Sequence, residues 1–112
     1  MSTKIKLALV AFDSLGDGLV HAMMAENFAQ NGFEVTYFYD LVSAIDHWLP
    51  NFRALPYPSI YDFERTLDRF DVVLMSPPRF IRNLPKEEVE RLACKYIFFC
   101  QKVDIFGGTI IP

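Results

Sequence analysis

The stretch KLALVAFDSLGDGLVHAMMAENFAQNGFEVTYFYD, residues 6–40, carries the pattern that decides the fold. Residues 6–12 form a short run rich in Leu, Ala and Val, which predicts a buried strand. A glycine-containing turn follows, and residues 17–30 predict a helix that ends at Asn31-Gly32. Residues 33–40 are rich in β-branched and aromatic side chains, so we expect a second strand there. The stretch is therefore a strand–helix–strand unit.

The same alternation continues along the rest of the chain. Ser59 and Asp62 resemble a capping box in which Asp replaces the usual Glu or Gln. The run DVVLMS suits a central strand that is buried on both faces. In chain order, the expected elements are a short helix over residues 41–49, a short strand within 51–58, a helix over 60–70, a strand over 71–76, a helix beginning near Pro85, a strand over 96–100, and a turn with a short last strand beyond it.

Alternating strands and helices predict an α/β fold with helices on both faces of a parallel sheet. Right-handed crossovers make it a doubly wound, mostly parallel Rossmann-like sheet with the strand order 3-2-1-4-5. We expect one three-layer domain spanning residues 1–112. Ligands of such folds bind outside the carboxyl ends of the strands, near the point where the strand order reverses. That edge carries residues 13–18 after the first strand and residues 76–82 after the fourth.

Composition excludes several classes of protein. Hydrophobic residues make up 52% of the 112 residues, which argues against disorder. The net charge of −3 gives no electrostatic basis for binding nucleic acid, and no apolar run is long enough to span a bilayer. The start of the chain predicts a strand and not a signal peptide. Cys94 and Cys100 form no disulfide framework, so we expect free thiols in a cytoplasmic protein.

The turn from Asp13 to Gly18 has three interpretations. Asp17, at a helix N-terminus, could be a base that accepts a proton from a hydroxyl group. It could instead serve only as the N-cap of the helix. In the third, Gly16 and Gly18 cradle a dinucleotide and Asp40 meets a ribose hydroxyl, although an Asp in the cradle repels a pyrophosphate and the third glycine is missing.

Other polar residues give weaker signals. Arg79 and Arg82 follow the fourth strand and could hold an anionic group of a ligand, or they could belong to a solvated loop. Asp13 could form a carboxylate pair with Asp17. His21 is expected in the core or behind the site, on a mostly apolar helix face. The histidines and cysteines have no metal-ligand spacing, so we predict neither a metal nor a cofactor.

Aromatic residues gather in the middle of the chain. They include Tyr37 and Tyr39, which share one face of the second strand, and Tyr57. Such rings often line sugar-binding clefts, but for most of them we expect a place in the core. His47 and Trp48 lie on the predicted helix over residues 41–49, where His47 is expected on the surface.

The motif Ser14-Leu15-Gly16-Asp17, after an apolar strand and before a helix, resembles the start of the heptosyltransferase family. These enzymes transfer heptose from ADP-heptose to lipopolysaccharide, and the order of elements up to Tyr96 is similar to their N-terminal, acceptor-binding domain. The resemblance implies that Asp17 is the catalytic base that activates the acceptor hydroxyl. It also implies that Ser14 and Gly16 shape the turn, and that the acceptor is a sugar or lipid-linked sugar. From their place at the predicted edge, and not from the resemblance, Asp13, Arg79 and Arg82 are further candidates for contacts with the acceptor. This chain has Ala11 where the family usually has Arg or Lys.

Heptosyltransferases have a second Rossmann-like domain that binds the nucleotide-sugar, and this sequence stops at Pro112 before such a domain. The resemblance therefore implies an N-terminal half that is inactive alone and works with a second polypeptide, or a free-standing relative that binds a ligand or a protein. An exposed apolar patch and a homodimer are expected for such a half. Whether the chain is an enzyme stays open. The alternatives are a small dinucleotide-binding module and a non-catalytic interaction domain.

Overall fold

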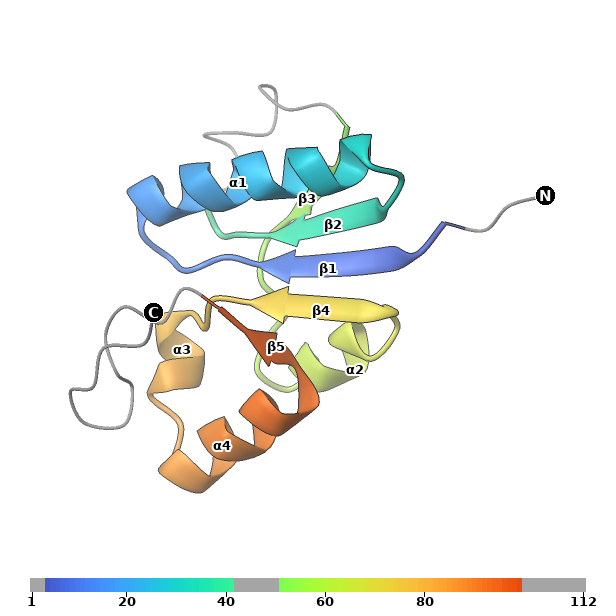
Figure 1. The fold of residues 1–112 in the computed structure, drawn as a ribbon. Helices are drawn as coiled ribbons and strands as arrows, with labels where there is room; N and C mark the ends of the chain where they lie inside the picture. The colour runs from blue at the N-terminus through green and yellow to red at the C-terminus, as the bar shows by residue number, and fades with distance from the viewer. Residues whose placement is uncertain (1–3, 42–50, 100–112) are drawn as a thin grey trace.

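The computed structural model describes residues 4–41 and 51–99 (Figure 1). Its sheet has five strands in the order β3-β2-β1-β4-β5, and every neighbouring pair is parallel. The predicted doubly wound, Rossmann-like α/β fold is confirmed. In chain order the elements are β1 (Lys6–Val10), α1 (Leu15–Gln30), β2 (Glu34–Phe38), β3 (Arg53–Leu55), α2 (Phe63–Leu67), β4 (Val72–Met75), α3 (Arg79–Arg82), α4 (Lys86–Lys95) and β5 (Ile97–Phe98).

The strand register places the switch point of the sheet beside β1. Val10, the last residue of β1, lies opposite Phe38 of β2 on one side and Met75 of β4 on the other. The chain moves outward from β1 to β2 and β3, and then returns to the opposite side of β1 to form β4 and β5. The loops that leave β1 and β4 therefore diverge at the carboxyl edge, where this fold places its ligands.

Helices cover both faces of the sheet, which gives the three layers that were predicted. In Figure 1, α1 lies on one face, and α2, α3 and α4 lie on the other. Strand residues alternate between the two faces, so β1 sends Leu7 and Leu9 toward α1 and Ala8 and Val10 toward the other helices. Two apolar cores result, one on each side of the sheet.

The face of the sheet on the α1 side is less well covered than the other. Val73 and Met75 of β4 are buried against α2, α3 and α4, whereas Val72 and Leu74 are only partly buried. The expectation that this strand is buried on both faces is therefore wrong for one face. The physical reason is that α1 packs mainly against β2, and among the described residues no other helix covers that side of β4.

Only half of the predicted capping box forms, and it does not start a helix. The Asp62 N–H donates to Ser59 Oγ (3.3 Å), and the Ser59 hydroxyl donates to Asp62 Oδ2 (3.2 Å). This turn precedes α2, whose N-cap is Asp62 itself and whose five residues are fewer than predicted. The local sequence therefore predicts the bond from the Asp62 N–H to Ser59 correctly, but not the second bond of the box or the length of the helix.

Several predictions lie outside the described residues. They are residues 42–49 of the helix predicted over 41–49, with His47 and Trp48, the state of Cys100, and the last short strand after it. Among the described helices, none is both long and apolar enough to cross a bilayer.

Candidate site at the carboxyl edge of the sheet

The first turn of α1 is held by a reciprocal pair of hydrogen bonds between Ser14 and Asp17. Ser14 is the N-cap, with extended backbone angles (φ −74°, ψ 151°), and its Oγ accepts from the Asp17 N–H (3.2 Å). The same hydroxyl donates to Asp17 Oδ2 (2.9 Å). The interpretation of Asp17 as N-cap is therefore wrong, because Ser14 has that position and α1 begins at Leu15, earlier than predicted. The carboxylate of Asp17 is half-buried at the carboxyl edge of the sheet.

The two glycines of this turn have different surroundings. A Cβ atom on Gly16 would have no neighbour within 4 Å, so nothing in its surroundings requires a glycine there. A Cβ atom on Gly18 would lie 2.1 Å from Cζ of Tyr39. Gly18 is thus required by the close approach of α1 to a tyrosine of β2's carboxyl end, and this explains it without a bound phosphate. A role of Gly16 in substrate binding stays a prediction.

Three tyrosine hydroxyls donate to backbone carbonyls near the carboxyl edge of the sheet. Tyr37 donates to the carbonyl of Gly18 (2.5 Å), and Tyr39 donates to the carbonyl of Ser14 (2.9 Å). Tyr57 donates to the carbonyl of Ala11 (2.5 Å), next to the loop that carries the candidate residues. Burial raises the pKa of all three hydroxyl groups, so they act as hydrogen-bond donors at neutral pH. Sequence reasoning placed most of these rings in the core and missed their hydroxyls, although a tyrosine, unlike Phe, at a buried strand position indicates a buried hydrogen bond.

The two arginines that follow β4 contact the loop after β1. The guanidinium carbons of Arg79 and Arg82 lie 5.1 Å and 4.5 Å from the centre of the Phe12 ring, which is cation–π geometry. The backbone N–H of Arg79 donates to Asp13 Oδ1 (3.0 Å), so Asp13 supports the start of α3. Arg82 also donates from Nε to the carbonyl of Pro77 (2.6 Å). The two carboxylates of the predicted pair therefore have different hydrogen-bond partners: Asp13 accepts from the backbone of α3, and Asp17 accepts from Ser14.

Charges of both signs meet at this edge. Burial lowers the pKa of the Arg82 guanidinium, and the negative charges of Asp13 and Asp17 oppose that shift. Arg82 is half-buried, whereas Arg79 is exposed. The arrangement offers carboxylates that can accept protons or hydroxyl hydrogen bonds, beside guanidinium groups that can bind an anion.

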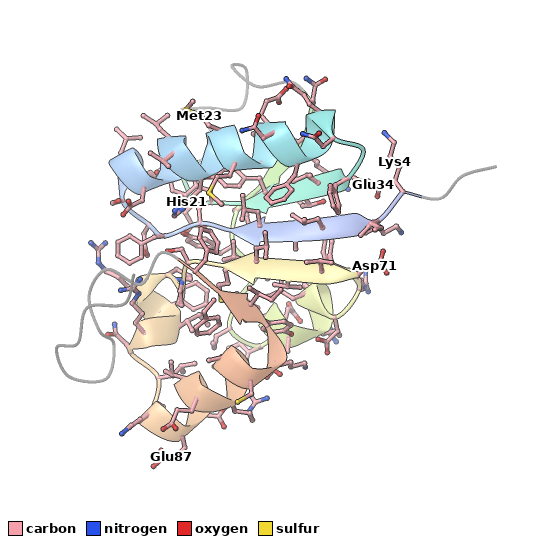
Figure 2. The ribbon with its side chains drawn as sticks, in the orientation of Figure 1. Lys4, His21, Met23, Glu34, Asp71 and Glu87 are labelled. Carbon is pink, nitrogen blue, oxygen red and sulfur yellow. The ribbon has the colours of Figure 1, made fainter. Side chains whose placement is uncertain are left out.

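His21 lies behind this edge, between α1 and the sheet (Figure 2), and only 2% of its surface is exposed. Its ring meets Phe99 edge-on, with the ring centres 5.1 Å apart, and its Nδ1 has no hydrogen-bond partner among residues 4–41 and 51–99. Burial lowers its pKa, and the charge of Asp17 partly opposes that change. The expectation of a core histidine is confirmed.

Asp40, the acidic residue of the dinucleotide alternative, is used by the next loop. Its Oδ1 accepts from the N–H of Tyr57 (2.9 Å), which links the end of β2 to the chain after β3. In the described part of the chain, no group of three or more His, Cys, Asp or Glu side chains is placed to hold a metal ion.

The fold defines the chain as a Rossmann-like α/β domain, and side chains of both charges lie at its switch point. Comparison with protein-family models, with curated proteins and with solved structures found no match.

Proposed function

We propose that the chain is the acceptor-binding, N-terminal domain of a heptosyltransferase-like glycosyltransferase. The observation that carries the proposal is the position of Asp17: its carboxylate is held by Ser14 in the first turn of α1, at the carboxyl edge of a Rossmann-like sheet. The motif that resembles the family thus lies where this fold binds ligands. The guanidinium of Arg82 adds a group that suits an anionic acceptor.

In the proposed reaction, Asp17 accepts the proton of an acceptor hydroxyl. The hydroxyl oxygen then forms a bond to the anomeric carbon of the donor sugar, and the bond from that carbon to the diphosphate breaks, so that the nucleoside diphosphate leaves. Arg79 and Arg82 hold an anionic group of the acceptor, and Asp13 keeps α3, which carries both arginines, against the loop after β1. The donor is held by a second Rossmann-like unit, in the same or another polypeptide, so the domain alone does not transfer sugar.

Replacing Asp17 tests the catalytic assignment. The domain is combined with the donor-binding domain of a heptosyltransferase, by fusion or as two chains, and transfer from ADP-heptose to lipopolysaccharide is measured. Asp17→Asn should lower the rate by about 10²–10⁴, the usual loss when a positioned base is removed. The melting temperature should hardly change, because the Asn side-chain oxygen can accept from Ser14 Oγ as the carboxylate does.

Asp62→Asn is the matched control for this experiment. Asp62 makes the same pair of hydrogen bonds with Ser59, but in the turn before α2. Its replacement should leave the transfer rate unchanged. If the restored enzyme keeps nearly full activity with Asp17→Asn, the catalytic role is wrong.

Anion binding tests the two arginines without any transfer assay. Inorganic phosphate should raise the melting temperature of the domain, and the Arg79→Ala/Arg82→Ala variant should lose that gain because the guanidinium groups are gone. The control is Arg65→Ala/Arg69→Ala, which removes two exposed arginines from α2 and the turn after it. An equal effect of phosphate on the wild type and both variants would contradict anion binding at this edge.

A further inference from the structure

A pocket lies beside the candidate site and is not part of the proposed reaction. Its volume is about 380 Å³, and it opens at the carboxyl edge next to β2 and β3. The lining residues are Asp40, Tyr57, Pro58, Ser59, Ile60 and Phe80. They come from the loop after β2, the chain after β3, and α3, so the pocket exists only because the sheet brings these segments together.

Two aromatic rings form walls of this pocket and are held in place from behind. The rings of Tyr57 and Phe80 have centres 5.5 Å apart and planes inclined by 55°, and both residues are half-buried. The hydroxyl of Tyr57 is bonded to the carbonyl of Ala11, and the ring of Phe80 packs edge-on against the buried Phe63 (5.5 Å). Rings fixed in this way can bind a ligand without losing conformational entropy.

The charged group of the pocket is the Asp40 carboxylate, which accepts hydrogen bonds. Asp40 is exposed, and the Tyr57 N–H uses one of the roughly four acceptor positions of its carboxylate. The other side-chain polar groups in the lining are the hydroxyls of Ser59 and Tyr57, and no lining residue is cationic. The lining therefore disfavours a phosphate and favours an uncharged group with several hydroxyl donors.

The pocket adjoins the candidate site through two residues. Phe80 belongs to the same short helix as Arg79 and Arg82, whose guanidinium groups reach Phe12. Tyr57 reaches the carbonyl of Ala11, in the loop that leads to Asp13. A ligand in the pocket can thus extend toward the carboxylates and guanidiniums of the edge.

We propose that this pocket binds the pyranose ring of a saccharide. A pyranose has an apolar face of C–H groups and a rim of hydroxyls, and this combination fits two aromatic walls beside a carboxylate. Tyr57 and Phe80 contact the C–H face, and Asp40 accepts hydrogen bonds from ring hydroxyls. The binding stands by itself, and only its identification as part of the acceptor rests on the proposed function.

The test titrates the full chain with methyl α-D-glucopyranoside and follows amide chemical shifts by NMR. We expect shifts that gather at Tyr57, Ile60 and Phe80. Sorbitol, a polyol with similar hydroxyl content but no rigid ring face, should bind at least about tenfold more weakly, the ratio that a difference of 1.4 kcal/mol produces. Equal binding of the two, or shifts that gather elsewhere, would overturn the proposal. Binding of adenosine without binding of the glucoside would overturn it in favour of a nucleoside pocket.

Three variants make the test specific. Asp40→Asn keeps an oxygen for the Tyr57 N–H but removes the charge, and should weaken glucoside binding about tenfold, since a charged acceptor makes stronger hydrogen bonds than a neutral amide oxygen. Phe80→Leu should weaken it similarly. Tyr61→Leu is the control, because Tyr61 is 93% exposed and does not line the pocket.

Unchanged affinity in both Asp40→Asn and Phe80→Leu would overturn the proposal. If Phe80→Leu fails to fold, Asp40→Asn alone decides. Glucoside binding is measured on the chain without a donor domain, so it stands or falls separately from the effect of Asp17→Asn on transfer.

Discussion

Alanine at Gly18 should destabilise the domain, whereas alanine at Gly16 should not. Both glycines lie in the first turns of α1, but only Gly18 faces a close neighbour. An added Cβ there would lie 2.1 Å from Cζ and 2.2 Å from the hydroxyl oxygen of Tyr39. Tyr39 is fully buried and its hydroxyl is bonded to the Ser14 carbonyl, so the ring cannot move aside without losing that bond.

The size of the effect follows from three contributions to the free energy of unfolding. Overpacking a core costs about 1–3 kcal/mol. Loss of the hydrogen bond from Tyr39 to Ser14 costs about 0.5–1.5 kcal/mol. Alanine gains back about 1 kcal/mol over glycine in a helix. Gly18→Ala should therefore lower the free energy of unfolding by about 0.5–3.5 kcal/mol, while Gly16→Ala should raise it by up to about 1 kcal/mol.

Urea unfolding of both variants measures these changes, and a double-mutant cycle tests their cause. Tyr39→Leu removes the end of the ring, so Gly18→Ala should cost less in that background than in the wild type. Strict additivity of the two changes, or a Gly18→Ala variant as stable as Gly16→Ala, would refute the steric explanation. A Gly18→Ala variant of unchanged stability that lost binding of a dinucleotide would instead favour the phosphate-cradle interpretation.

Two further predictions concern pH and association. Burial lowers the pKa of His21, so the unfolded chain takes up a proton at this residue at a higher pH than the folded chain does. The free energy of unfolding should therefore fall as the pH decreases below 6.5, the ordinary pKa of histidine. The His21→Phe variant should show a weaker dependence between pH 7.5 and 5.5, and parallel pH profiles of the two proteins would contradict this prediction. Val20 and Met23 project from the outer face of α1 and are 57% and 64% exposed, and Figure 2 shows Met23 pointing away from the sheet. We therefore expect self-association through this face, reduced by Met23→Glu, and a monomer at every concentration in sedimentation experiments would contradict this.

The first turn of α1 shows which features of the site can be predicted from neighbouring residues alone. The motif from Ser14 to Asp17 predicted a polar turn at the start of a helix, and the hydrogen bonds that form it span only three residues. Its detail was wrong, because the serine and not the aspartate is the N-cap. Both are good N-caps, and composition alone does not decide which of them adopts the extended backbone.

The rest of the candidate site depends on contacts between distant segments. Asp13 bonds to the backbone of Arg79, 66 positions along the chain, and both arginines meet the ring of Phe12. Sequence reasoning placed these residues at one edge, because parallel strands end together. It did not predict the contact of both arginines with Phe12, since Phe12 was expected at the end of a strand and lies in the loop instead.

The sequence by itself determined the order of the five strands along the chain, the strand order 3-2-1-4-5 in the sheet and the edge at which polar residues gather. It did not predict α3, because residues 79–82 were expected in a loop after the fourth strand. Hydrophobic periodicity and turn residues act over a few positions, and the handedness of crossovers leaves few topologies. Only the tertiary structure decided that Gly18 faces Tyr39 while Gly16 faces nothing, and that Tyr57 and Phe80 enclose a pocket with Asp40. These contacts depend on strand register and on the direction of each side chain, which become fixed only when the sheet and its helices pack together.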